Sequence, residues 1–263
     1  MFHWLTFAFY AASAVPVIAS LARSEQPRKL PSLALFAIAV ACHAVALWQS
    51  VVSPEGYRLD FSASLSLVLL TVNFLVLLLT LRHPLQLLLP LLAPAGLLAE
   101  SAAFYQWGGA ADYAKMSPEL ASHIALSVAA YSLLTIATLQ ALYLAFQNHQ
   151  LRHGRLGGIS RFLPPLQSME HLLFWLLALG ELLLTASLIT GLLFVDDILG
   201  QHLLHKTVLS LVAWALYAVL LWGHWRWGWR GSTAVRWTLG AFAALMLAYF
   251  GSKLVLEIIL DRA

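Results

Sequence analysis

The stretch SASLSLVLLTVNFLVLLLTL, residues 62–81, decides the fold because it contains no charged side chain over its whole length. A helix rises about 1.5 Å per residue, and about 20 apolar residues cross the hydrocarbon layer of a bilayer. The stretch therefore predicts a transmembrane helix. Similar apolar runs recur along the chain and predict eight such helices, at about Phe2–Leu21, Ser32–Val52, Ser62–Leu81, Pro84–Phe104, Glu119–Phe146, Ser168–Phe194, Leu203–Trp227 and Thr233–Leu260.

The composition supports a membrane protein, because 61% of the 263 residues are hydrophobic and only 10% are charged. Soluble domains carry about 25% charged residues, so the composition argues against a soluble enzyme. Eight spans leave no room for a separate soluble domain, and we expect one all-α, polytopic domain over residues 1–263, embedded in a lipid bilayer. The basic residues are scattered and the net charge is only +3, which argues against a nucleic-acid partner.

The lysines and arginines predict the orientation of the chain, because cytoplasmic loops carry an excess of them. The loops after the first, third, fifth and seventh expected helices hold ten of the fifteen basic residues: Arg23, Arg28, Lys29, Arg82, Arg152, Arg155, Arg161, Arg226, Arg230 and Arg236. The opposite side holds Arg58, Lys115, Lys206, Lys253 and Arg262. Both termini are therefore expected on the outer side, in the periplasm or its equivalent.

Ionisable side chains inside apolar spans are costly and commonly functional. Those in the expected spans are His43, Glu100, His123, Glu170, His171, Glu181, His205, Lys206, His224 and Lys253. Neutral imidazole is a good ligand for iron, copper and zinc. His123 and His205 begin the fifth and seventh helices on the outer side, and His202 precedes His205 by about one turn. The seventh helix also carries His224 at its inner end, whereas His43 lies near the middle of the second helix.

These polar groups also have simpler interpretations. Each buried histidine could form a hydrogen bond between helices. Lys206 and at least one of Glu100 and Glu181 are expected to face the interior of the bundle. Four histidines at span ends or in loops are expected to be solvated or interfacial: His3, His83, His149 and His153. The tryptophans at positions 222, 225, 227 and 229 fit either an aromatic belt at the membrane surface or an edge that handles a cofactor.

The segment from His205 to Trp214, followed by Leu221-Trp222-Gly223-His224 and Gly228-Trp229-Arg230-Gly231, resembles the end of the cytochrome c assembly protein superfamily. This superfamily includes the CcsA, CcmC and HemX-like proteins. Pro118-Glu119-Leu120-Ala121-Ser122-His123, with Tyr131 eight residues later, resembles the family's first external histidine motif. Cys42-His43-Ala44 and His205-Lys206-Thr207 also resemble patches in an inner-membrane member of similar size.

The resemblance implies an inner-membrane protein that binds or moves haem, or that supports cytochrome maturation together with maturation proteins. It implies a cofactor site drawn from His123, His205, His202, His43, His224 and Lys206. We expect His123 and either His205 or His202 to ligate one haem iron at the outer surface. His43 and His224 form a second, weaker candidate pair.

The sequence departs from the family pattern in two places. Residues 194–202, which match the family's tryptophan-rich haem platform, contain no tryptophan. The external histidine expected after the last helix is absent, and Lys253 and Glu257 stand in that neighbourhood. We therefore do not expect a haem-attaching synthase. Two alternatives are an ion- or proton-linked transporter with His43, Glu100 and Glu181 as a relay, and a structural accessory subunit.

Overall fold

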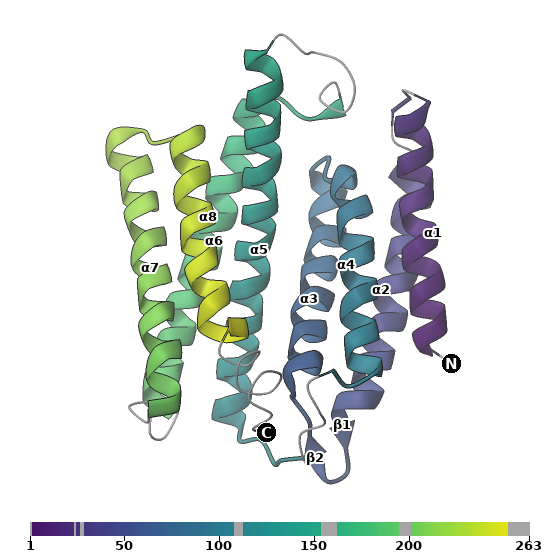
Figure 1. Ribbon diagram of the computed structural model, residues 1–263, viewed down its shortest axis with the longest axis vertical. Helices are drawn as coiled ribbons and strands as arrows, with labels where there is room; N and C mark the ends of the chain where they lie inside the picture. Colours follow the sequence, from purple (N-terminus) through teal and green to yellow (C-terminus); the bar gives the residue numbers. More distant parts are fainter. Residues whose placement is uncertain are drawn as a thin grey trace. The chain divides into compact units, whose positions relative to one another are not determined.

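The protein is an all-α, multi-pass membrane protein (Figure 1). The structure, a computed structural model, describes residues 2–23, 25–26, 29–107, 113–153, 162–194 and 201–251, excepting the side chains of residues 194, 201–205, 250 and 251. Its elements are α1 (Phe2–Ala22), α2 (Lys29–Val51), β1 (Val52–Ser53), β2 (Gly56–Tyr57), α3 (Phe61–Arg82), η1 (Gln86–Leu88), α4 (Leu89–Phe104), α5 (Pro118–Arg152), α6 (Leu166–Phe194), α7 (Gln201–Trp227), α8 (Ser232–Met246) and η3 (Leu247–Gly251).

Seven helical segments in the described residues are long and apolar enough to cross a membrane, which confirms the predicted fold class. The eighth predicted span coincides with α8 and η3 as far as Gly251. Its remainder, to Leu260, lies outside the described residues.

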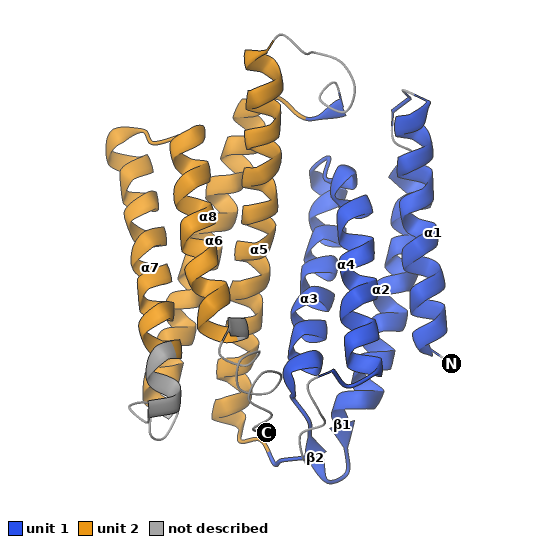
Figure 2. Cartoon of the chain, viewed as in Figure 1, with its two compact units in different colours: residues 1–115, 156–163, 263 blue, residues 116–155, 164–262 orange. Residues whose placement is uncertain are grey.

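The helices form two compact units (Figure 2). Unit 1 comprises residues 1–115, 156–163 and 263, and unit 2 comprises residues 116–155 and 164–262. In unit 1, α1 and α3 each pack against both α2 and α4. In unit 2, α5 packs against α6 and α8, and α7 packs against the same two helices. The prediction of a single domain over 1–263 stays a prediction.

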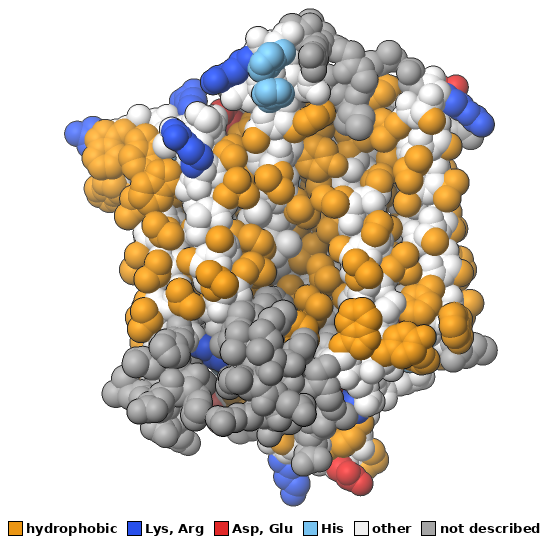
Figure 3. Space-filling model, in the orientation of Figure 1, with side chains coloured by type: hydrophobic (Ala, Val, Ile, Leu, Met, Phe, Trp, Pro, Cys, Tyr) orange, Lys and Arg blue, Asp and Glu red, His pale blue; other side chains and the backbone are white. Residues whose placement is uncertain are grey.

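The outer faces of the helices are apolar, as a lipid environment requires. Large side chains such as Leu98, Leu182 and Val15 are at least 60% exposed. Exposure of this apolar surface to water would be unfavourable, whereas contact with lipid hydrocarbon is not. Figure 3 shows hydrophobic side chains over the drawn faces of the helices and Lys and Arg side chains near the helix ends.

The helix ends follow local chemistry. Asp60 caps α3 by accepting a hydrogen bond of 2.7 Å from the backbone N–H of Ala63. Ser117 caps α5 in the same way, and Pro118 occupies the first helical position, where its missing N–H costs nothing. Gly231 precedes α8 with φ of 57°, a conformation that other residues rarely adopt.

Two predicted boundaries were wrong. The fifth helix, predicted to end at about Phe146, continues as far as Arg152, because no glycine or proline interrupts the chain before Gly154. The fourth helix does not begin at Pro84, because the chain first makes a tight turn in which the Leu85 N–H donates to the His83 carbonyl at 2.8 Å. The chain instead enters α4 through the short 3-10 turn η1.

Candidate functional site

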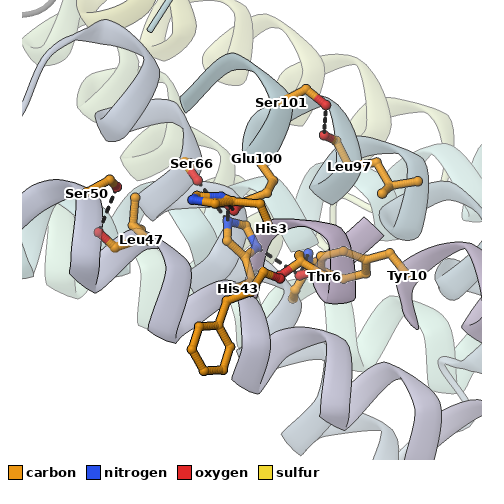
Figure 4. A network of polar contacts seen from close by, with 12 residues as sticks. His3, Thr6, Tyr10, His43, Leu47, Ser50, Ser66, Leu97, Glu100 and Ser101 are labelled. Carbon is orange, nitrogen blue, oxygen red and sulfur yellow. Dashed lines mark hydrogen bonds and ion pairs between the residues drawn. The ribbon is translucent and has the colours of Figure 1, made fainter. Parts of the chain in front are cut away.

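A buried polar network lies within unit 1 (Figure 4). The carboxylate of Glu100 on α4 is held between two imidazoles. Nδ1 of His3 on α1 lies 2.6 Å from Oε1, and Nε2 of His43 on α2 lies 3.0 Å from Oε2. The Glu100 side chain is 1% exposed and that of His43 is fully buried. Three helices therefore contribute ionisable groups to one point of the interior.

His43 is held by polar neighbours on both of its nitrogens. Its Nδ1 lies 3.0 Å from the hydroxyl of Tyr10, and its Nε2 lies 2.8 Å from the hydroxyl of Ser66. Asn73 donates from Nδ2 to the Tyr10 hydroxyl at 2.8 Å. Because both ring nitrogens are occupied, His43 can ligate a metal ion only if these contacts break.

Gly96 on α4 provides the space for this arrangement. A Cβ atom at position 96 would lie 2.8 Å from Nδ2 of Asn73 and 2.9 Å from Cζ of Tyr10. Small residues at contacts between membrane helices allow such close approach. Gly96 therefore lets α1 and α3 bring their polar side chains against α4.

The sequence did not predict the contact that His3 makes. Its side chain is 21% exposed and contacts the carboxylate of Glu100. Its position in the first turn of α1 suggested a free chain end, whereas the packing of α1 against α4 turns the ring inward.

His123 in unit 2 has the arrangement of a metal-ligating histidine. It lies in the second turn of α5, is half-buried, and its Nδ1 contacts the backbone carbonyl of Ser187 at 3.0 Å and the hydroxyl of Thr190 at 3.2 Å. An N–H at Nδ1 that donates to these oxygens leaves the lone pair on Nε2. Among the described residues, Nε2 has no hydrogen-bond partner.

Close packing on α6 fixes the ring of His123. A Cβ atom at Gly191 would lie 3.0 Å from Cε1 of this ring. Ser127, one turn further along α5, contacts the hydroxyl of Ser187 at 2.7 Å and ties the two helices together. The donor set therefore fits one axial ligand of a haem iron, because imidazole is such a ligand.

His224 near the end of α7 is oriented in a similar manner. Its Nδ1 contacts the backbone carbonyl of Trp229 at 2.7 Å, and its ring stacks on Phe174 with centroids 3.4 Å apart. The turn between α7 and α8 is also fixed by Glu170, whose Oε1 accepts a hydrogen bond from the backbone N–H of Gly231 at 2.9 Å. The neighbouring Trp222 and Trp225 are exposed and contact each other edge to face.

The remaining predicted site residues stand as follows. α5 and α7 begin at the same end of unit 2 (Figure 1), as predicted. The side chains of His202 and His205 lie outside the described part of the structure, so their pairing with His123 stays a prediction. Lys206 is half-buried. His43 and His224 belong to different units and have partners within their own units.

The two buried carboxylates also belong to different units. Glu100 in unit 1 contacts two histidines, whereas Glu181 on α6 in unit 2 is 8% exposed and neither of its oxygens has a hydrogen-bond partner among the described residues. The prediction that at least one of them faces the interior is confirmed, because both are buried.

Sequence reasoning missed the partners that orient these histidines. Tyr10 and Asn73 are polar residues within apolar runs, which was a usable signal, whereas Ser66 follows Ser62 and Ser64 and does not stand out. Ser187 and Thr190 carried no such signal, because their role depends on which residue of α5 lies opposite α6. No group of three or more His, Cys, Asp or Glu side chains forms a metal-binding cluster within the described ranges.

Comparisons with known proteins agree with this architecture. The chain is 32% identical to the inner membrane protein YpjD of Escherichia coli (strain K12) over 265 aligned residues, covering 98% of this chain and 99% of the relative. It is 25% identical to the protein HemX of Brevibacillus brevis over 134 residues, about half of each chain. No solved structure matches it significantly. The sequence model of the family described as cytochrome C assembly protein matches residues 32–260, and the chain therefore belongs to that family.

Proposed function

We propose that this protein handles haem at the end of unit 2 where α5 begins, and that it supports cytochrome maturation without acting as a synthase. The observation that carries the proposal is the orientation of His123, whose Nδ1 is engaged by Ser187 and Thr190 while Nε2 has no partner among the described residues. Membership of the cytochrome c assembly family supports haem as the ligand.

In this proposal His123 and either His205 or His202 would hold the haem iron through their imidazole nitrogens. When bound, haem would supply the iron centre to which the imidazoles bind, and the protein would hold this haem or pass it to another protein. The Ser187 carbonyl fixes the direction of the His123 ring. The apolar outer faces of the helices and the lipid enclose the porphyrin plate, and the partners are haem and cytochrome-maturation proteins.

The proposal includes an orientation in a bacterial inner membrane. Both termini lie outside, because the loops after the first, third, fifth and seventh helices hold most of the basic residues. The beginnings of α5 and α7 then face the outer compartment, where cytochromes c mature.

The test is haem reconstitution of the purified protein, followed by its Soret absorption. We expect a Soret band in the unaltered protein that weakens and shifts in the His123→Ala and His205→Ala variants. His153→Ala is the matched control, because His153 is exposed and follows the far end of the same helix, α5. The proposal is wrong if no Soret band forms, or if the band is unchanged in both ligand variants.

A further inference from the structure

We propose that His3 and Glu100 form a proton-binding site in unit 1, in which the imidazole and the carboxyl share one exchangeable proton. The ligand is a proton from water, and its uptake forms one O–H or N–H bond without an oxidant or reductant. These residues are not part of the proposed haem site.

The geometry places one proton between the two side chains. His3 Nδ1 and Glu100 Oε1 are 2.6 Å apart, a distance short enough to require a hydrogen between them (Figure 4). That hydrogen belongs either to an imidazolium donating to a carboxylate or to a carboxylic acid donating to a neutral imidazole. Both arrangements hold the same number of protons.

His43 lies next to the second carboxyl oxygen of Glu100 without supplying a positive charge. The amide of Asn73 donates to the Tyr10 oxygen, so the hydroxyl proton of Tyr10 is available to donate to Nδ1 of His43. His43 then carries its own hydrogen on Nε2, which donates to the Ser66 hydroxyl, while Oε2 of Glu100 lies 3.0 Å from this nitrogen and accepts no hydrogen bond among the described residues. This neutral form satisfies Tyr10 and His43 together, whereas a doubly protonated ring would leave the Tyr10 proton without an acceptor in the network.

Among the groups around Glu100, His3 is the one that can balance its negative charge. The ionisable groups that the surrounding helices contribute are His3 and Tyr10 from α1 and His43 from α2, while α3 contributes the neutral Ser66 and Asn73. In the described part of unit 1, no Lys or Arg forms an ion pair with Glu100.

Among the described lysines and arginines of unit 1, Arg23 follows the end of α1 and Lys115 is exposed. Lys29 begins α2 and Arg82 ends α3, at the helix ends far from His43 and Ser66, and Arg58 pairs with Asp60 at 3.5 Å. An unpaired carboxylate buried in hydrocarbon is costly. Sharing a proton with His3 removes that cost.

His3 also connects the site to the outside of unit 1. Its side chain is 21% exposed, whereas that of Glu100 is 1% exposed. It lies in the first turn of α1, so a proton reaches the buried carboxyl through the imidazole. The pair can therefore exchange its proton with one side of the membrane.

The test is infrared spectroscopy of the full chain in lipid nanodiscs, which follows the C=O band of protonated carboxyl groups as pH is stepped reversibly. We expect a pH-dependent band that is lost in Glu100→Gln. In His3→Gln the band should be present but constant across the same pH range, because Glu100 then keeps its own proton. Glu181→Gln controls for the other buried carboxyl, and Glu55→Gln controls for an exposed one.

The outcomes separate clearly, and none requires haem. A pH-dependent band that survives in Glu100→Gln, or one that titrates in His3→Gln as it does in the unaltered protein, overturns the proposal. A band that disappears in Glu181→Gln also overturns it, and this variant leaves the site itself intact. Absence of any pH-dependent carboxyl band in the unaltered protein overturns it without a variant.

Discussion

The substitution Gly223→Ala tests how the turn after α7 orients His224. The indole of Trp229 folds over Gly223, and a Cβ atom there would lie 2.4 Å from Cε3 and 2.5 Å from Cδ2 of the ring. The indole is rigid, so it must swing away as a whole. The backbone of Trp229 is held in the same turn. Its N–H donates to the Gly223 carbonyl at 3.2 Å, and its carbonyl oxygen lies 2.7 Å from Nδ1 of His224.

The magnitude follows from two opposing effects. Overpacking of a filled site lowers the free energy of unfolding by about 1–3 kcal/mol. Replacing glycine by alanine within a helix raises it by up to about 1 kcal/mol. Gly240→Ala is the matched control, because Gly240 lies inside α8 and nothing lies within 4 Å of its added Cβ. The helix gain cancels between the two variants, so Gly223→Ala should be less stable than Gly240→Ala by about 1–3 kcal/mol.

The assay is reversible unfolding of both variants in detergent micelles, with denaturant titration followed by circular dichroism. The unfolding free energy of Gly240→Ala should equal or exceed that of the unaltered protein. If Gly223→Ala is as stable as Gly240→Ala, the indole does not pack on this glycine and the account of the turn is wrong.

Three further predictions concern the rest of the chain. Gly96→Ala should be less stable than Gly240→Ala by about 1–3 kcal/mol in the same assay, because the new Cβ displaces Asn73; equal stabilities would contradict the packing. Glu181→Leu should raise thermal stability, because it removes a buried carboxylate whose oxygens have no partner among the described residues; a lower melting temperature would contradict this reasoning. Alkaline phosphatase fused after Ala263 should be active and a fusion after Gly157 inactive; the reverse pattern would contradict the orientation.

Much of the fold could be predicted from the sequence, because long uncharged runs are required to cross a bilayer. The errors lie where local chemistry decides, as at Pro84 and at the polar end of α5. The pairing of the helices could not be predicted in the same way. These helices are apolar on almost every face, so their sequences do not show which face meets a neighbour.

For the candidate sites, too, single residues could be predicted from the sequence but their contacts could not. The ionisable residues His123 and Glu100 stood out as candidates because charge inside a span is rare. The contact between His3 and Glu100 joins residues 97 positions apart and depends on the packing of α1 against α4. The orientation of His123 likewise depends on which turn of α6 lies opposite it.

The most direct test of the central claim is the haem content of the protein purified from bacterial membranes, measured as pyridine haemochrome per mole of protein. The account predicts bound haem that is strongly reduced in His123→Ala and retained in His153→Ala. Haem content no higher than that of an unrelated membrane protein prepared in parallel, in cells supplied with a haem precursor, would contradict the claim.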